Sequence, residues 1–140
     1  MDSSTRFEHT LTVRFHEVDR AGIVFFGRIF EYCHVGFEEL LSAMGMTSVF
    51  HEENWGMPLV HAEADFKRPM FMGDKITVSL RVEKMGKGSI TFGFEVLGAD
   101  DRKVRAIAQQ VHAFVELEKM RPTEFPPTLL NGLRSVGLVE

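Results

Sequence analysis

The sequence predicts an α+β domain in which one long helix packs on an antiparallel sheet. Five segments alternate apolar and polar residues with a period of two, which is typical of strands that bury one face. One further segment carries an apolar stripe at helical spacing. The order along the chain is one strand, the helix and then four strands. We therefore expect two layers within a single domain that spans residues 1–140.

The first four strands are expected at residues 10–15, 60–67, 76–83 and 89–96. Each has an apolar and a polar face, as in an antiparallel sheet that covers a core on one side. The side chains predicted to face the core are Leu11, Val13 and Phe15; Val60, Ala62, Ala64 and Phe66; Ile76, Val78, Leu80 and Val82; and Ile90, Phe92, Phe94 and Val96.

The fifth strand, residues 104–117, changes phase along its length. Residues 104–108 alternate in one phase, and residues 111–117 continue one residue out of step. A β-bulge near Gln109 and Gln110 would absorb the extra residue. The pattern then predicts that Val111, Ala113, Val115 and Leu117 continue the buried face.

The helix is expected from Gly27 to Met44, with Gly45 as its C-terminal stop. Its predicted apolar stripe consists of Ile29, Phe30, Cys33, Phe37, Leu40, Leu41 and Met44. Residues 47–57 are expected to form a short turn or helical piece. From Arg121 onward the prolines favour a loop, followed by at most a short helix.

Composition excludes several classes of protein. The net charge of −4 argues against nucleic-acid binding. A single Cys cannot form an internal disulfide and fits a reducing compartment. The first residues lack a signal-peptide pattern, and no apolar run approaches the ~20 residues of a membrane span. We therefore expect a cytoplasmic protein that does not insert into membranes.

Asp19 lies in a short polar turn between the first strand and the apolar helix. A carboxylate in this position can act as a nucleophile or general base on an activated carbonyl, while helix N–H groups stabilise the oxyanion. The alternative is purely structural, because Asp commonly caps turns and helix ends. The turn alone does not decide between these roles.

The motifs around this turn resemble those of the 4-hydroxybenzoyl-CoA thioesterase family, whose hotdog fold wraps a sheet around a central helix. The resemblance covers about residues 9–128. It is carried by Phe15, Asp19 with Ala21-Gly22-Ile23-Val24, Asp65-Phe66-Lys67-Arg68-Pro69 and Gly73-Asp74. The resemblance extends to the 1,4-dihydroxy-2-naphthoyl-CoA thioesterases of quinone biosynthesis. Residues 58–62 slightly favour this group. Arg20 stands where relatives often carry Pro or Ala, and Phe26 stands where an aromatic residue, often Tyr, is usual.

The resemblance implies hydrolysis of an acyl-CoA, with an aromatic acyl group favoured, and no metal or redox cofactor. It implies that Asp19 is the nucleophile or general base and that the N–H groups of Phe26 and Gly27 form the oxyanion hole. Hotdog sites form between protomers, so it also implies a homo-oligomer, expected to be a tetramer built from dimers.

Further residues are expected to contact the acyl-CoA: His16, Val24, Phe25, His61, Glu63, Arg68, Lys87, Gly88 and Ser89. Lys87 to Ser89 are favoured because relatives run pantetheine along the equivalent strand opening. Arg68 and other exposed cations are candidates for the CoA phosphates, although most such side chains are merely solvated. His61, Glu63 and Asp65 have metal-ligand chemistry but form only a line along one strand, so no metal site is predicted.

Two other functions remain open from the sequence. A hotdog hydratase or dehydratase would use a positioned acid or a histidine, for which His16 and His61 are available. A non-catalytic acyl-CoA-binding module would use the same pocket without turnover. The fold alone does not choose among the three.

Overall fold

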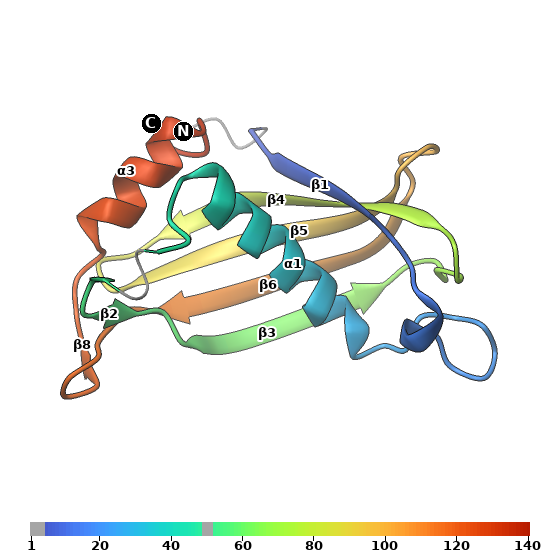
Figure 1. Ribbon diagram of the computed structural model, residues 1–140, viewed down its shortest axis with the longest axis horizontal. Coiled ribbons are helices and arrows are strands. Elements are labelled where there is room, and N and C mark those ends of the chain that lie inside the picture. Colours follow the sequence, from blue (N-terminus) through green and yellow to red (C-terminus); the bar gives the residue numbers. More distant parts are fainter. Residues whose placement is uncertain (1–4, 49–51) are drawn as a thin grey trace.

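Residues 5–48 and 52–140 are described by the computed structural model, in which a five-stranded antiparallel sheet curves around one long helix (Figure 1). The strand order is β1-β4-β5-β6-β3. The elements of this layer pair are β1 (Phe7–Thr12), α1 (Arg28–Ala43), β3 (Leu59–Phe66), β4 (Lys75–Met85), β5 (Ser89–Gly98) and β6 (Val104–Ala113). The predicted α+β hotdog architecture is confirmed.

Smaller elements close one end of this sheet. A second, three-stranded sheet consists of β2 (Trp55–Gly56), β7 (Val115–Glu116) and β8 (Arg121–Pro122). The short helix α3 (Pro127–Ser135) follows, as the sequence allowed. In the region predicted as a turn or helical piece, residues 47–48 form a turn and residue 52 is helical, and β2 follows at its end; residues 49–51 of that prediction lie outside the described residues.

The core lies between α1 and the inner face of the sheet. α1 begins and ends within one residue of the predicted bounds, and Gly45 follows with the positive φ of a helix stop. Ile29, Cys33 and Leu40 of the predicted stripe are fully buried. The predicted inner faces of β4 and β5 are also confirmed, since Ile76, Val78, Leu80, Val82, Ile90, Phe92, Phe94 and Val96 are all buried.

The first strand lies earlier in the chain than predicted. β1 ends at Thr12, and a 3-10 turn at Phe15–Glu17 follows. Phe15, predicted to face the core, is 79% exposed. The prediction for Phe15 is wrong because the chain leaves the sheet after Val13, whose N–H donates the last sheet-like bond to the carbonyl of Asp74.

The predicted apolar face of the second strand is not buried in the single chain. β3 is an edge strand paired only with β6, and its Val60 and Phe66 are 61% and 51% exposed. α1 packs chiefly on β4, β1 and β6, so the helix does not cover the β3 edge of the sheet. Half-exposed apolar side chains on an unpaired edge are typical of a surface that meets another chain.

The fifth strand also differs from prediction. No bulge occurs at Gln109–Gln110, because Gly93 and Phe92 pair with these two residues in unbroken register. The register shift lies instead near Arg105, between the pairs of Val96 and Leu97. Gln110 and His112 consequently face the core, at 4% and 7% exposure. Val111 and Ala113 belong to the opposite face, contrary to the prediction, and Phe114 is buried after the strand ends.

Gly36 sits where α1 approaches β4 most closely. A Cβ there would lie 2.7 Å from Cγ1 of Val78, so we expect Gly36→Ala to lower the free energy of unfolding. Overpacking costs about 1–3 kcal/mol, against the roughly 1 kcal/mol that Ala gains over Gly in a helix. Urea unfolding measures the difference. Ser42→Ala, at an exposed position of the same helix, is the control and should not be destabilised; equal stability of both variants would contradict the close packing.

Candidate active site

The turn that carries Asp19 is closed by hydrogen bonds to Asp19 itself. Its N–H donates to the carbonyl of Ile23 at 2.7 Å. Its carboxylate Oδ1 accepts the N–H groups of Ala21 at 2.8 Å and Ile23 at 3.3 Å. The structural role considered from the sequence is therefore real. The side chain is exposed and only Oδ1 is used in these bonds, so the turn holds the carboxylate in place without engaging Oδ2.

The chain entering α1 leaves two adjacent N–H groups unpaired. The N–H of Phe25 donates to Glu17, that of Arg28 to Phe25, and that of Ile29 to Phe26. Within residues 5–48 and 52–140, neither the N–H group of Phe26 nor that of Gly27 donates a hydrogen bond. Free N–H groups at the start of a helix attract negative charge. These are the two donors that the sequence resemblance assigned to the oxyanion hole.

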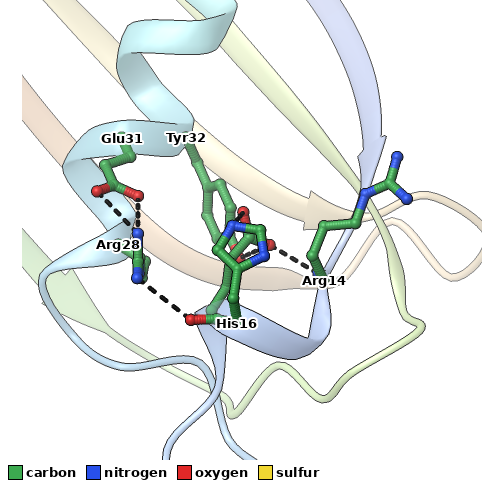
Figure 2. A network of polar contacts seen from close by, with 6 residues as sticks. Arg14, His16, Arg28, Glu31 and Tyr32 are labelled. Carbon is green, nitrogen blue, oxygen red and sulfur yellow. Dashed lines mark hydrogen bonds and ion pairs between the residues drawn. The ribbon is translucent and has the colours of Figure 1, made fainter.

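A polar network ties the 3-10 turn before Asp19 to the first turns of α1 (Figure 2). Glu17 Oε1 accepts the N–H of Arg14 at 2.7 Å and the hydroxyl of Tyr32 at 3.0 Å. Burial, followed by the hydrogen bond to Glu17, raises the pKa of Tyr32, so the phenol remains a donor.

The same network includes the surface of α1. Arg28 donates to both carboxylate oxygens of Glu31 and, at 3.2 Å, to the carbonyl of His16 (Figure 2). The side chain of His16 itself is 69% exposed and lies 3.8 Å from Glu17. The turn and the helix start are thus held as one unit.

Several predicted site residues lie together beside this turn. Val24, Phe26 and Arg68 line a pocket of about 340 Å³ with Ile23 and Phe66. Phe25 contacts Phe26, with ring centroids 4.6 Å apart. Arg68 is held by a 2.7 Å bond from its guanidinium to the carbonyl of Val104. The end of β3 therefore forms one wall of the pocket next to the helix start.

Lys87, Gly88 and Ser89 lie at the far end of the sheet from Asp19 within one chain. The Asp19 turn contacts the end of the sheet where β4 begins, through the bridge between Ile23 and Phe71. The 11 residues of β4 span about 35 Å before the turn at Lys87. There the carbonyl of Lys87 accepts the N–H of Phe125, and the carbonyl of Gly88 accepts the N–H of Phe114.

His61 and Glu63 are bonded to each other at 3.2 Å and lie on the outer face of the sheet, away from α1. This follows from their pairing with Val111 and Gln109, which alternate with the buried residues of β6. Among the described residues, no three His, Cys, Asp or Glu side chains are placed to share a metal ion.

Sequence reasoning missed three polar residues near the core: Glu17, Tyr32 and His112. Tyr32 is 2% exposed and lies beside the helix stripe, where an isolated Tyr passes for a core residue. His112 was missed because the predicted phase of the fifth strand placed it on the exposed face. Its Nδ1 lies 2.8 Å from the carbonyl of Met57, and its ring stacks on Phe37 with centroids 5.5 Å apart.

Burial lowers the pKa of His112; the hydrogen bond to the Met57 carbonyl opposes this shift, and the neighbouring His34 adds to it. The unfolded chain therefore binds a proton more readily than the folded chain, and stability should be complete above about pH 6.5 and fall as the pH drops toward the folded pKa. One proton changes the free energy of unfolding by at most about 1.4 kcal/mol per pH unit. Urea unfolding between pH 7 and pH 5 measures this slope. His112→Asn, which cannot titrate, should show a shallower dependence; identical slopes would refute the assignment.

Within the described ranges, no helix has the length and apolar character needed to cross a bilayer. Residues 13–133 match the model of the thioesterase-like superfamily. The chain is 33% identical over 131 residues to a 1,4-dihydroxy-2-naphthoyl-CoA hydrolase of Nostoc punctiforme, covering 92% of this chain and 87% of that protein. It is 30% identical to the hydrolase of the same name from Rippkaea orientalis, covering 91% and 95% of the two chains.

The fold is similar to that of a solved 1,4-dihydroxy-2-naphthoyl-CoA thioesterase from Synechocystis. The TM-score is 0.86 at 24% identity, over 93% of this chain and 96% of that chain. The match to the family model over most of the chain, together with this fold and the two relatives, identifies the chain as a member of the thioesterase-like superfamily with the hotdog fold, and as a thioester hydrolase.

Proposed function

We propose that this protein hydrolyses an aromatic acyl-CoA of the hydroxybenzoyl or dihydroxynaphthoyl type, releasing the acid and free CoA. The single observation that carries the proposal is the pair of unpaired N–H groups at Phe26 and Gly27, next to the turn that holds Asp19. The names of the two relatives favour 1,4-dihydroxy-2-naphthoyl-CoA as the acyl donor.

In the proposed reaction, the thioester carbonyl oxygen lies against the N–H groups of Phe26 and Gly27. Asp19 either attacks the carbonyl carbon or takes a proton from an attacking water. Negative charge then develops on the carbonyl oxygen, where the two N–H groups and the helix dipole stabilise it. Collapse of the intermediate breaks the C–S bond and releases the CoA thiolate. Direct attack requires a second step, in which water hydrolyses the Asp19 anhydride.

The proposed assembly is a dimer formed by the β3 edges, with a tetramer built from two such dimers. The unpaired edge and the exposed side chains of Leu59, Val60 and Phe66 support it. Analytical ultracentrifugation tests this directly. A species of twice or four times 15.9 kDa is expected, and a stable 15.9 kDa monomer would contradict the proposal.

Thiol release from a panel of aryl and aliphatic acyl-CoAs tests the function. Turnover should be fastest on hydroxylated aromatic thioesters. Turnover confined to aliphatic thioesters would overturn the choice of acyl group. CoA esters that bind without releasing thiol would instead favour the non-catalytic binding module.

A further inference from the structure

A largely apolar groove lies beside His112, next to the helix. It encloses about 490 Å³, within the range of small-molecule sites. We call it the His112 groove; its lining includes His34, Phe37, Leu41, Met57, Pro58, His112 and Leu117. Phe37 stacks on His112 at an interplanar angle of 23°, so the imidazole presents a flat, aromatic wall. Such a lining suits a planar aromatic group.

His112 is the polar group buried in this wall. Its Nδ1 lies 2.8 Å from the carbonyl oxygen of Met57. A carbonyl oxygen only accepts, so Nδ1 must carry the hydrogen, and in the neutral ring Nε2 is then an acceptor. Among the described residues, none donates a hydrogen bond to Nε2. His112, at 7% exposure, therefore offers one unused acceptor in a groove whose lining is apolar apart from His112 itself and His34.

The groove and the Asp19 turn lie at opposite ends of β3. Met57 and Pro58 immediately precede the strand, whereas Phe66 at its end lines the pocket with Val24 and Phe26. Antiparallel pairing of two β3 edges places the start of one strand beside the end of the other. In the proposed dimer, the His112 groove of one subunit therefore meets the Asp19 turn of its partner.

We infer that the His112 groove binds the aromatic ring of the acyl group whose thioester is cleaved at the partner subunit's Asp19, and that Nε2 of His112 accepts a hydrogen bond from a ring hydroxyl. This inference rests on the proposed function and adds a specificity-determining residue to it. It predicts a preference for acyl groups that carry a hydroxyl far from the thioester carbonyl, because only these satisfy the buried acceptor.

The test compares two free acids that differ in one hydroxyl: 1,4-dihydroxy-2-naphthoate and 1-hydroxy-2-naphthoate. Their dissociation constants are measured by calorimetry, which needs no turnover. The wild-type protein should bind the dihydroxy acid about three- to tenfold more tightly, the ratio that one neutral hydrogen bond supplies. His112→Asn keeps a donor for Met57 but ends short of Nε2, so the ratio should fall to about one. His112→Gln, which can present its carbonyl near the position of Nε2, should retain part of the preference.

A preference unchanged in His112→Asn would overturn the inference, as would failure of the wild-type protein to bind either acid. If the variants do not fold, nitrogen NMR of the wild-type imidazole replaces them: Nε2 should shift with the dihydroxy acid and not with the other. These readouts stand apart from thiol release, so a protein that binds as expected without hydrolysing thioesters would refute only the proposed function.

The partner relation has its own readout. Asp19→Asn chains are mixed and refolded with chains whose groove is filled by Leu41→Trp. A site shared between subunits should regain thioesterase activity in mixed dimers, up to about a quarter of the wild-type level for random pairing of two chains. A site contained in one chain would regain none, which would refute the assignment of the groove to the partner.

Discussion

Asp19→Asn is expected to lower kcat on the best aryl-CoA by roughly 10²–10⁴-fold. Asn retains the oxygen that accepts the N–H groups of Ala21 and Ile23, so the turn should keep its shape. What is lost is the negative charge and the basic or nucleophilic Oδ2. Thiol release under saturating substrate measures the effect, and KM should change far less than kcat because the ring and the CoA are bound elsewhere.

The control for this experiment is stability. Because the exposed Asp19 side chain contributes mainly through the turn bonds that Asn preserves, the urea midpoint of Asp19→Asn should stay close to that of the wild-type protein. Undiminished turnover in a folded variant would refute the catalytic role of Asp19. Glu63→Gln and His16→Asn would then be the next variants to assay, since they remove the other acid and base predicted from the sequence.

The parts of the fold that local patterns determine could be predicted from the sequence. The helix stripe around Cys33 and the inner faces of β4 and β5 follow from simple periodicity, because each element buries one side against its own chain. The fifth strand could not be predicted in the same way. Its buried face contains Gln110 and His112, which look like solvent residues until their partners in three dimensions are known.

In the candidate site, too, some features follow from local sequence and others depend on the three-dimensional fold. Phe26 and Gly27 follow Asp19 by seven and eight residues in sequence, so a local motif indicates all three. The link between Glu17 and Tyr32 depends on how the 3-10 turn docks on the helix. The exposed face of β3 points to a surface that one chain cannot bury, and no periodicity within that chain identifies what covers it.

Phe26→Pro is expected to separate the backbone donor from the side chain at the oxyanion hole. Phe26 is the second residue of the turn closed by the N–H of Arg28 and the carbonyl of Phe25, a position that suits Pro. Pro removes the N–H, and loss of one such donor costs about 10²–10³-fold in kcat.

Phe26→Ala is the matched control, because it removes the same ring, 66% exposed, and keeps the N–H. We expect kcat of the Ala variant to remain close to that of the wild-type protein and that of the Pro variant to fall, with α1 intact in both by circular dichroism. Equal rates in the two variants would refute the oxyanion role of this N–H. A large loss in both would instead assign the function to the aromatic ring. The expected difference would show that the group that acts on the substrate is the main-chain N–H of Phe26 and not its ring.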